Sequence, residues 1–263
     1  MNELYHRLIE RTMEKKNVCV AFSTQKGGAG KTTLTVLTAS YLYYVKGYSV
    51  AVVDCDYPQY SIARMRERDI RMATEDDYYK RLAYEQFTRL DRKMYPVITS
   101  VPEKAAETAR ALVEKDRYDL IFLDLPGTVN TEGILYALSQ MDYIFCPVSA
   151  DRVVLESSLR FASRISEKLV ATGRSNIKGL YLVWNMVDGR EKTELYEVYE
   201  RVIAELGLKV LKTFLPDSKR FRRELSAGHR PLFRSTMFPA DRALVRGSHL
   251  DALAEEIAEI VIG

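Results

Sequence analysis

The chain has 263 residues, of which 47% are apolar and 29% are charged, and its net charge of +3 identifies no partner by itself. This balance is ordinary for a soluble globular enzyme. No apolar run approaches the roughly 20 residues that span a bilayer, and the N-terminus lacks the basic-then-apolar order of a secretory signal. The three cysteines, Cys19, Cys55 and Cys146, form no CxxC pair, which argues against a metal cluster or disulfide framework and favours a cytoplasmic location.

The predicted elements alternate between short apolar strands and longer helices. Residues 1–16 have apolar side chains at helical spacing, which predicts an amphipathic lead-in helix. Strands are predicted at 18–22, 50–53, 96–100, 120–123, 143–147, 180–184 and 210–214. Helices are predicted near 31–46, 59–72, 75–93, 102–115, 131–140, 152–171, 190–205 and 249–262. Strands that are apolar on both faces and followed by helices indicate an α/β fold with a mostly parallel twisted sheet, covered by helices on both faces.

Segment 57–95 is the least regular part of the pattern, because it is rich in Tyr, Arg and Asp. We expect it to form an inserted or mobile helical lobe with a switch role. No internal repeat or low-complexity linker interrupts the chain, so residues 1–263 are interpreted as one domain.

A phosphate-binding loop is predicted between the first strand and the first long helix. Its sequence is Gly27-Gly28-Ala29-Gly30-Lys31-Thr32-Thr33. The glycines let backbone N–H groups approach the phosphates, and the helix N-terminus adds partial positive charge. We expect Lys31 to reach the β- and γ-phosphates, Thr32 to ligate Mg²⁺ and Thr33 to bind the α-phosphate. A dinucleotide GxGxxG loop is excluded because Thr33 stands in place of the last glycine. The sequence therefore predicts a P-loop NTPase.

Two residues at the front of this loop differ from the general pattern GxxxxGK[ST]. Gln25 stands where the pattern has glycine, and Lys26 is a second lysine. A single nucleotide does not require a second lysine so close to Lys31. From the residues alone, Lys26 either faces solvent or has a function of its own.

Two apolar strands end in carboxylates. Asp54 and Asp56 follow the strand at 50–53, and Asp124 follows the strand at 120–123. Ligands bind beyond the carboxyl ends of parallel strands, so these acids should face the loop. Asp124 has the form of a Walker B acid that holds Mg²⁺ through water. Asp54 and Asp56 are two residues apart and should point the same way: one could organise the metal shell and the other the attacking water, or one could cap the next helix.

These motifs together resemble the ParA/MinD family of deviant Walker A ATPases. The matching stretches are 25–33, 53–56 with Pro58-Gln59, and 122–126, and the order of strands extends the resemblance over roughly 17–262. Gln25 before Lys26 resembles the ParA branch, since the MinD branch usually has glycine there. The pattern from Asp54 to Gln59 also resembles ParA-type proteins of conjugative elements.

The resemblance implies catalytic and metal-binding roles. In this family the extra lysine crosses a dimer interface to the partner's nucleotide, which favours a functional Lys26 beside Lys31. The second acid of the pair positions the hydrolytic water, which assigns catalysis to Asp56. Asp54 then joins Thr32 and Asp124 in the metal shell. The implied cofactors are ATP and Mg²⁺, and the implied partners are a second copy of the chain and a ParB-like or other activating protein.

The resemblance also implies a site for the base. Asn185, after the strand at 180–184, matches the asparagine that reads adenine, and Pro216 and Asp217 match the loop that flanks the base. The stretch from Asn185 to Asp188 has the outline of a guanine-reading NxxD, but no lysine follows the asparagine. Tyr57 is inserted between the second acid and Pro58-Gln59, so the course of this switch segment differs from that of the ParA branch.

The resemblance leaves DNA, membrane and protein as candidate partners. ParA-like dimers bind DNA non-specifically, whereas MinD-like proteins use a basic C-terminal amphipathic helix on membranes. The helix predicted at 249–262 is acidic, so anionic lipid would repel it and we expect no membrane binding. Between Lys209 and Arg246, ten Lys or Arg oppose three acids. This basic stretch is either a DNA-binding surface or a solvated face.

The spacing of apolar and basic residues after Pro216 indicates which cations of this stretch could bind DNA. A short helix capped by Asp217 or Ser218 and running to Ala227 or Gly228 would place Phe221 and Leu225 toward the core. The cations on this helix are Lys219, Arg220, Arg222 and Arg223, with Arg230 and Arg234 as possible additions. A protein partner in place of DNA remains the alternative, and a metabolic P-loop enzyme would require a substrate pocket for which the sequence offers no further catalytic constellation.

Overall fold

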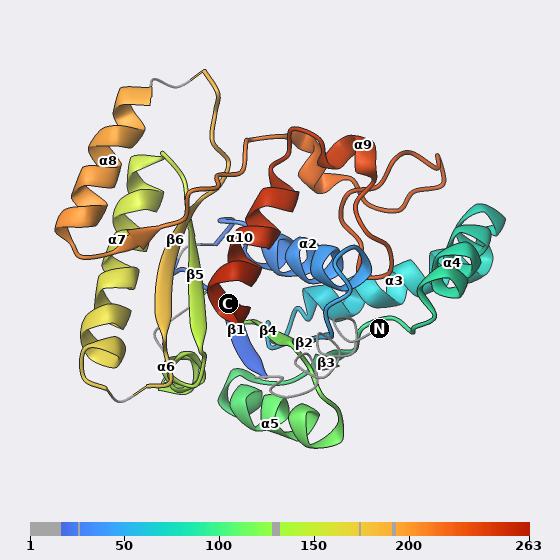
Figure 1. Ribbon diagram of the computed structural model, residues 1–263, viewed down its shortest axis with the longest axis horizontal. Coiled ribbons are helices and arrows are strands. Elements are labelled where there is room, and N and C mark those ends of the chain that lie inside the picture. Colours follow the sequence, from blue (N-terminus) through green and yellow to red (C-terminus); the bar gives the residue numbers. More distant parts are fainter. Residues whose placement is uncertain (1–16, 26, 128–131, 174, 191–192) are drawn as a thin grey trace, which may run out of the picture.

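The computed structural model describes residues 17–25, 27–127, 132–173, 175–190 and 193–263. The predicted lead-in helix and Lys26 lie outside these residues. At the centre of the described chain is a seven-stranded sheet with the order β3-β2-β4-β1-β5-β6-β7, and its strand pairings are parallel (Figure 1). The strands are β1 Val18–Phe22, β2 Val50–Asp54, β3 Val97–Thr99, β4 Leu120–Asp124, β5 Tyr143–Val148, β6 Gly179–Trp184 and β7 Lys209–Val210. The predicted α/β fold with a parallel sheet is confirmed.

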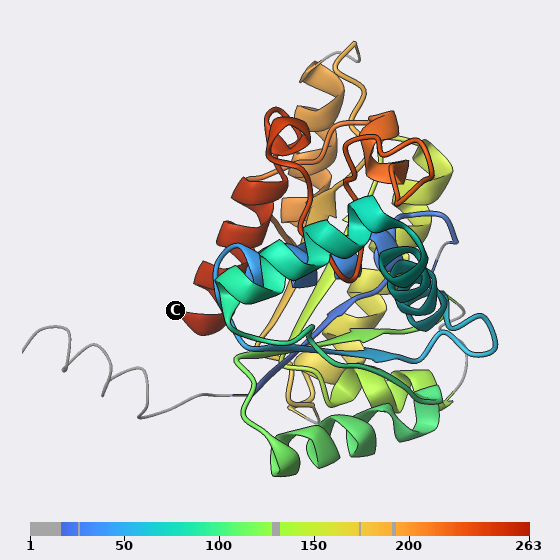
Figure 2. The ribbon, with the colours of Figure 1, turned by 90° about the vertical axis from the view of Figure 1, so that its right-hand side faces the viewer.

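Alternation along the strands divides the core into two layers. In β1, Val20 and Phe22 face a cluster that includes Leu34 and Leu253, whereas Ala21 faces a cluster on the opposite side of the sheet. Helices cover both faces, as Figure 2 shows. The first face is covered by α2 Lys31–Tyr44, α3 Ser61–Glu75 and α10 Leu250–Ile262; the second is covered by α5 Ala105–Lys115, α6 Glu132–Ser139, α7 Arg152–Ile165 and α8 Thr193–Glu205. Because both faces are buried, the strands have the continuous apolar sequences that predicted them.

The strand predicted at 210–214 is shorter than expected. The sheet ladder ends at Val210 because the backbone N–H groups of Lys212 and Thr213 donate to the Glu256 carboxylate of α10, at 2.8 and 2.9 Å. The apolar face of α10, with Leu253 and Ile257, is buried in the core. Within the described part of the chain, no helix combines the length and apolar character needed to cross a bilayer.

Segment 57–95 is more regular than its composition indicates. It forms α3, which packs on the sheet, and α4 Asp77–Leu90, which projects from the main body (Figure 1). Tyr79 and Ala83 of α4 pack in a third cluster with Leu225 and Leu232 from the C-terminal part of the chain. The helix pair α3–α4 covers this cluster with one side and exposes its other side to solvent. The exposed side explains the many charged residues of segment 57–95.

The helix predicted from 217 or 218 to about 228 is wrong. The structure has one 3-10 turn, η3 Lys219–Arg222, whose N-cap is Ser218. Beyond it Arg223 is extended, and its carbonyl oxygen accepts from the N–H groups of Phe233 and Arg234 at 2.9 and 2.8 Å. Tertiary contacts therefore draw the chain into a loop that returns on itself before the short helix α9 Arg242–Val245.

Candidate functional site

The glycine-rich loop joins β1 to α2 at the carboxyl edge of the sheet. Gly28 and Gly30 have positive φ angles of 80° and 92°, a backbone region that glycine adopts without steric cost. Gly30 has a second constraint, because a Cβ there would lie 2.6 Å from the Asn185 amide nitrogen. The Asn185 amide donates to the Ala29 carbonyl at 2.9 Å. Asn185, which directly follows β6, thus holds the loop in place.

A cavity of about 420 Å³ extends from this loop toward the C-terminal part of the chain. At one end lie the predicted phosphate-binding residues Lys31, Thr32 and Thr33. The same lining includes the residues predicted to surround the base, Asn185, Pro216 and Asp217, together with Met186. Gly27 and Ala29 line a smaller hollow of about 120 Å³ that Gly28, Asn185 and Met186 also line. The structure therefore brings the two predicted halves of a nucleotide site into one cavity.

Asp124 is fully buried at the end of β4. Among the described residues, neither of its carboxylate oxygens accepts a hydrogen bond of normal geometry, although the Thr32 hydroxyl lies near enough to lower its pKa. Burial is the main cause that raises the pKa of this carboxyl to about 7; the adjacent Thr32 hydroxyl and the Lys31 ammonium lower it, and Asp54 and Asp56 raise it. An unsatisfied buried carboxylate is costly without a compensating ligand.

A divalent cation fits these residues. Thr32 and Asp124 offer the oxygen donors that Mg²⁺ prefers, and Mg²⁺ usually takes only one or two carboxylates together with substrate phosphates. The described residues contain no cluster of three or more His, Cys, Asp or Glu side chains suited to a metal ion. When bound, Mg²⁺ neutralises charge on the phosphate oxygens.

The carboxylates of Asp54 and Asp56 lie in different surroundings. Asp54 is fully buried, and its Oδ2 accepts from the backbone N–H groups of Ile62 and Ala63, both at 2.9 Å. Its Oδ1 accepts from the N–H of Asp56 at 3.2 Å. Burial raises the pKa of Asp54, against the lowering effect of these bonds. Asp54 thus caps the first turn of α3, the alternative that the sequence left open, and its metal-binding role stays a prediction.

Asp56 is half-buried, and its contact with the Ser61 hydroxyl is long, at 3.4 Å. It lies one residue before the exposed Tyr57, the inserted residue of the switch segment. Its carboxylate is the more accessible of the pair. This geometry is compatible with the water-positioning role predicted for Asp56.

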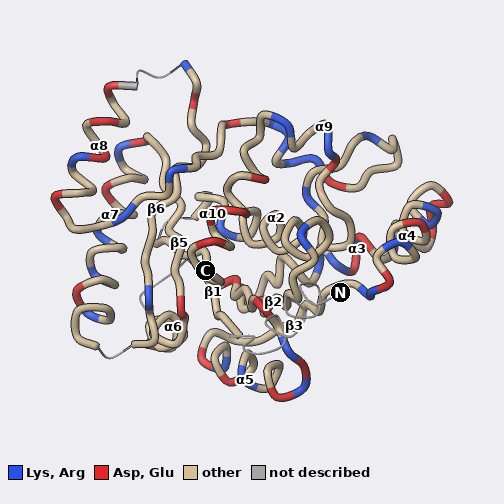
Figure 3. The backbone as a smooth tube through the Cα atoms, in the orientation of Figure 1, with Lys and Arg blue, Asp and Glu red and all other residues tan. Residues whose placement is uncertain are grey.

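The predicted DNA-binding cations divide into three groups. Arg220 is held within the fold, because its guanidinium Nη1 donates to the carbonyl oxygens of Leu244 and Arg246 at 2.8 and 2.7 Å. Arg222 and Arg234 line the nucleotide-sized cavity. The remaining candidates, Lys219, Arg223 and Arg230, are exposed. Figure 3 shows Lys and Arg distributed along this C-terminal part around α9.

Sequence reasoning missed the cavity role of Arg234. Its guanidinium Nη1 donates to the Thr33 hydroxyl at 2.5 Å, a contact between residues 201 positions apart. Local spacing contains no signal for such a contact, because the loop between Arg223 and Arg234 creates it.

The guanine-reading alternative finds no support in this arrangement. The Asp188 carboxylate accepts from the backbone N–H, Nε and Nη2 of Arg190 at 2.9, 3.0 and 2.8 Å. These bonds are the main cause that lowers the pKa of Asp188 to about 2. Asp188 is absent from the residues that line the cavity, whereas Asn185 is present.

Comparison with known proteins agrees with this geometry. The model of the CobQ/CobB/MinD/ParA nucleotide binding domain matches residues 20–232. The chain is 28% identical over 216 residues to the chromosome-partitioning ATPase Soj of Thermus thermophilus, covering 80% of this chain and 85% of that one. The cell division ATPase MinD of Pyrococcus furiosus has a similar fold, with a TM-score of 0.60 at 20% identity, covering 93% of this chain and 99% of that one.

A putative plasmid partition protein of Borrelia burgdorferi bound to AMPPNP also shares the fold, with a TM-score of 0.56 at 16% identity, covering 94% of this chain and 100% of that one. The two structural likenesses concern the fold alone. The family match covers most of the chain and includes the phosphate-binding loop, both acid-ended strands and the segment around the base. The chain therefore belongs to the CobQ/CobB/MinD/ParA family of nucleotide-binding P-loop proteins.

Proposed function

We propose that this protein is a Mg²⁺-dependent ATP hydrolase of ParA type. It dimerises on binding ATP, and the dimer binds DNA without sequence preference. Its process is the partitioning of DNA or the maintenance or transfer of a conjugative element, with a ParB-like or other activating protein, in the cytoplasm. The name of the Thermus thermophilus relative, a chromosome-partitioning ATPase, supports this process.

One observation carries the hydrolase proposal. The buried carboxylate of Asp124 accepts no hydrogen bond of normal geometry among the described residues, and it lies at the end of β4 next to Thr32 at the start of α2. This pair forms a place for Mg²⁺ beside Lys31. In the proposed mechanism Lys31 binds the terminal phosphates, Asp56 orients the attacking water, and Lys26 of one protomer reaches the nucleotide of its partner.

Exposed cations near the cavity support the DNA proposal. Lys219 begins η3 and Arg223 follows it, and Ser218, Phe221 and Arg222 of the same stretch line the cavity. A change in nucleotide could therefore act directly on the surface that meets phosphates of DNA. The alternative is a nucleotide-gated regulator that recruits a protein partner without DNA, and this alternative would use the same cavity.

Phosphate release tests the hydrolase proposal. We expect wild-type protein to hydrolyse ATP with Mg²⁺ and to stop when EDTA is added. Asp124→Asn removes the charge with little change in shape, and we expect its turnover to fall by about 100-fold or more, the order seen when electrostatic stabilisation is lost. Asp188→Asn, on the exposed loop, is the matched control and should keep wild-type turnover. Equal turnover of the Asp124→Asn and wild-type proteins would contradict the proposal.

A further inference from the structure

A cation from the C-terminal part of the chain lies in the nucleotide cavity. Arg234 lines this cavity, and its side chain is 23% exposed. Nη1 donates to the Thr33 hydroxyl at 2.5 Å, and Nε and Nη2 both donate to Oε1 of Glu224, at 2.9 and 2.6 Å. A guanidinium is planar and permanently charged, so these two neighbours fix both the position and the direction of the charge.

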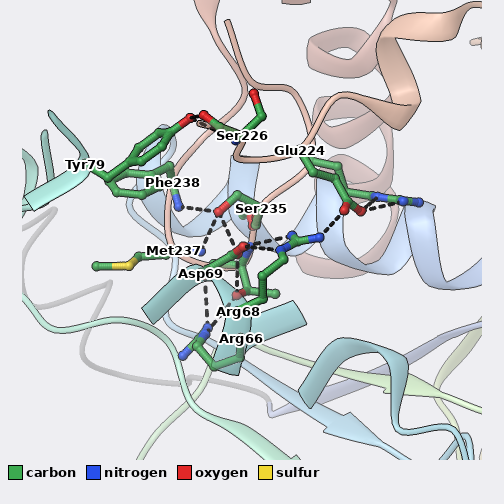
Figure 4. Close-up of polar contacts among 12 residues, drawn as sticks. Arg66, Arg68, Asp69, Tyr79, Glu224, Ser226, Ser235, Met237 and Phe238 are labelled. Carbon is green, nitrogen blue, oxygen red and sulfur yellow. Dashed lines mark hydrogen bonds and ion pairs between the residues drawn. The ribbon is translucent and has the colours of Figure 1, made fainter. Parts of the chain in front are cut away.

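Arg234 is the first member of a chain of alternating charges that continues through Glu224 and Arg68 to Asp69. Oε2 of Glu224 pairs with Nη1 of Arg68 on α3, and Nη2 of Arg68 pairs with Oδ1 of Asp69 at 2.8 Å. Figure 4 shows Arg68 between Glu224 and Asp69. Asp69 is fully buried, and its Oδ2 accepts from the Ser235 hydroxyl and from the backbone N–H of Thr236, both at 2.8 Å. The network therefore joins α3 to Glu224, which precedes Arg234 in the sequence, and to Ser235 and Thr236, which follow it.

The bond to Thr33 has a chemical consequence. A hydroxyl has one hydrogen to donate and two lone pairs that accept. Arg234 occupies a lone pair of Oγ1 in Thr33, which leaves the hydroxyl hydrogen available for an anionic acceptor. Thr33 is the third residue of α2, where the helix N-terminus also favours an anion. Hydroxyl, guanidinium and helix end thus meet at one point of the cavity.

We propose that Arg234 binds a phosphate of the nucleotide jointly with Thr33, and that Glu224 positions it for this contact. The inference rests on the proposed function, because it requires the cavity to bind a nucleoside phosphate. Thr33 is the residue predicted to meet the α-phosphate, which ADP and ATP share. The contribution of Arg234 is therefore the same for both nucleotides, unlike that of a group that recognises the terminal phosphate.

Glu224 also limits the strength of this contact. Its carboxylate is shared between Arg234 and Arg68, so a bound phosphate competes with Glu224 for Arg234. Asp54 caps the start of α3. The same helix therefore has polar contacts with Asp54 at its start and, through Arg68, with Glu224, which holds Arg234.

The test measures the binding of ADP, ATP and adenosine to the full chain by titration calorimetry, with NMR shifts for adenosine. Hydrogen bonds to charged groups lead us to expect that Arg234→Ala weakens both nucleotides by roughly 10- to 100-fold and leaves adenosine unchanged. Arg234→Lys should recover part of the loss, because it restores the charge without the planar fork. Arg242→Ala removes a cation of α9 that does not line the cavity, and it should bind all three ligands like wild type.

A double-mutant cycle tests the joint action of the two residues. If Thr33 and Arg234 bind the same phosphate, the losses for Thr33→Ala and Arg234→Ala should not add in the double variant. Additive losses, an equal loss for adenosine and ADP, or no loss in Arg234→Ala would overturn the inference. Wild-type protein that binds neither ATP nor ADP would overturn the proposed function itself, which separates the two failures.

Discussion

At the scale of single residues, Lys31 lines the cavity and interacts electrostatically with Asp124 and Asp56, which lie outside the cavity lining. Burial lowers the pKa of Lys31, whereas the negative charges of Asp124 and Asp56 raise it. The same burial raises the pKa of Asp124. The charge of each group therefore offsets part of the cost that burial places on ionising the other.

The two lysines of the loop should differ in what they bind. We expect Lys31→Ala to abolish nucleotide binding, because its ammonium lies in the cavity lining. Lys26→Ala should bind ATP normally and fail to dimerise, because the family resemblance implies that the Lys26 side chain crosses the dimer interface to the partner's nucleotide. Nucleotide titration followed by size-exclusion chromatography with ATP distinguishes the two variants. A Lys26→Ala protein that still dimerises with ATP would refute the role assigned to Lys26.

Asp56→Ala should bind Mg-ATP and hydrolyse it at least about 100-fold more slowly than wild type. Positioning of water acts in the transition state, so its loss lowers turnover more than affinity. The variant should therefore accumulate as a dimer. Rate and affinity are measured on the same preparation, with Asp54→Ala as the comparison. Normal hydrolysis by Asp56→Ala together with slow hydrolysis by Asp54→Ala would reverse the two assignments.

At the scale of elements, α3 depends on a carboxylate from another element. Asp54 ends β2, yet it accepts from two N–H groups in the first turn of α3. Helix N-termini leave N–H groups unpaired, and a side chain that accepts from them stabilises the helix. The local sequence of α3 does not provide this cap, since Tyr60 at its N-cap position makes no side-chain bond to it.

We expect Asp54→Ala to lower the free energy of unfolding by about 1–3 kcal/mol, because buried N–H groups lose their acceptor. Urea denaturation without nucleotide measures this loss. Asp151→Ala is a matched control, since Asp151 caps α7 through the N–H of Val154 at 2.9 Å and lies away from the switch segment. A stable Asp54→Ala protein with weakened Mg²⁺ affinity would instead assign Asp54 to the metal.

The elements with strong local signals were predictable from the sequence, and those set by distant contacts were not. Buried parallel strands have continuous apolar runs, so β1, β2 and β4, and the acids at the ends of β2 and β4, follow from the pattern. The helix predicted beyond Ser218 does not form, because the carbonyl of Arg223 accepts from Phe233 and Arg234. For the same reason, no local pattern indicated that Arg234 lies beside Thr33. Capping by Asp54 was one of two open interpretations, which only tertiary structure could separate.

At the scale of the whole molecule, we propose that dimerisation couples ATP binding to DNA binding. The exposed cations Lys219, Arg223 and Arg230 number too few for tight binding by one subunit. Two subunits double the contacts and add avidity. Because phosphate contacts carry no sequence information, the dimer should bind any DNA duplex with similar affinity.

Salt dependence measures the size of this surface. If the dimer neutralises about four to six phosphates, log K should fall with log salt at a slope of roughly −4 to −5. Lys219→Ala/Arg223→Ala should weaken binding with ATP and make the slope shallower, without changing ATP affinity. Fluorescence anisotropy across a salt series tests both. The same affinity and slope for the double variant and wild type would remove these two residues from the DNA surface.

Sedimentation velocity with and without a DNA duplex tests the central claim most directly, since it follows nucleotide state, dimerisation and DNA binding in one experiment. We expect a monomer without nucleotide and with ADP, a dimer with Mg-ATP, and co-sedimentation with DNA only in the presence of Mg-ATP at low salt. A monomer under all three nucleotide conditions, or a DNA complex that forms equally in each, would contradict the account. An ATP-dependent dimer that ignores DNA at low salt would favour the protein-partner alternative.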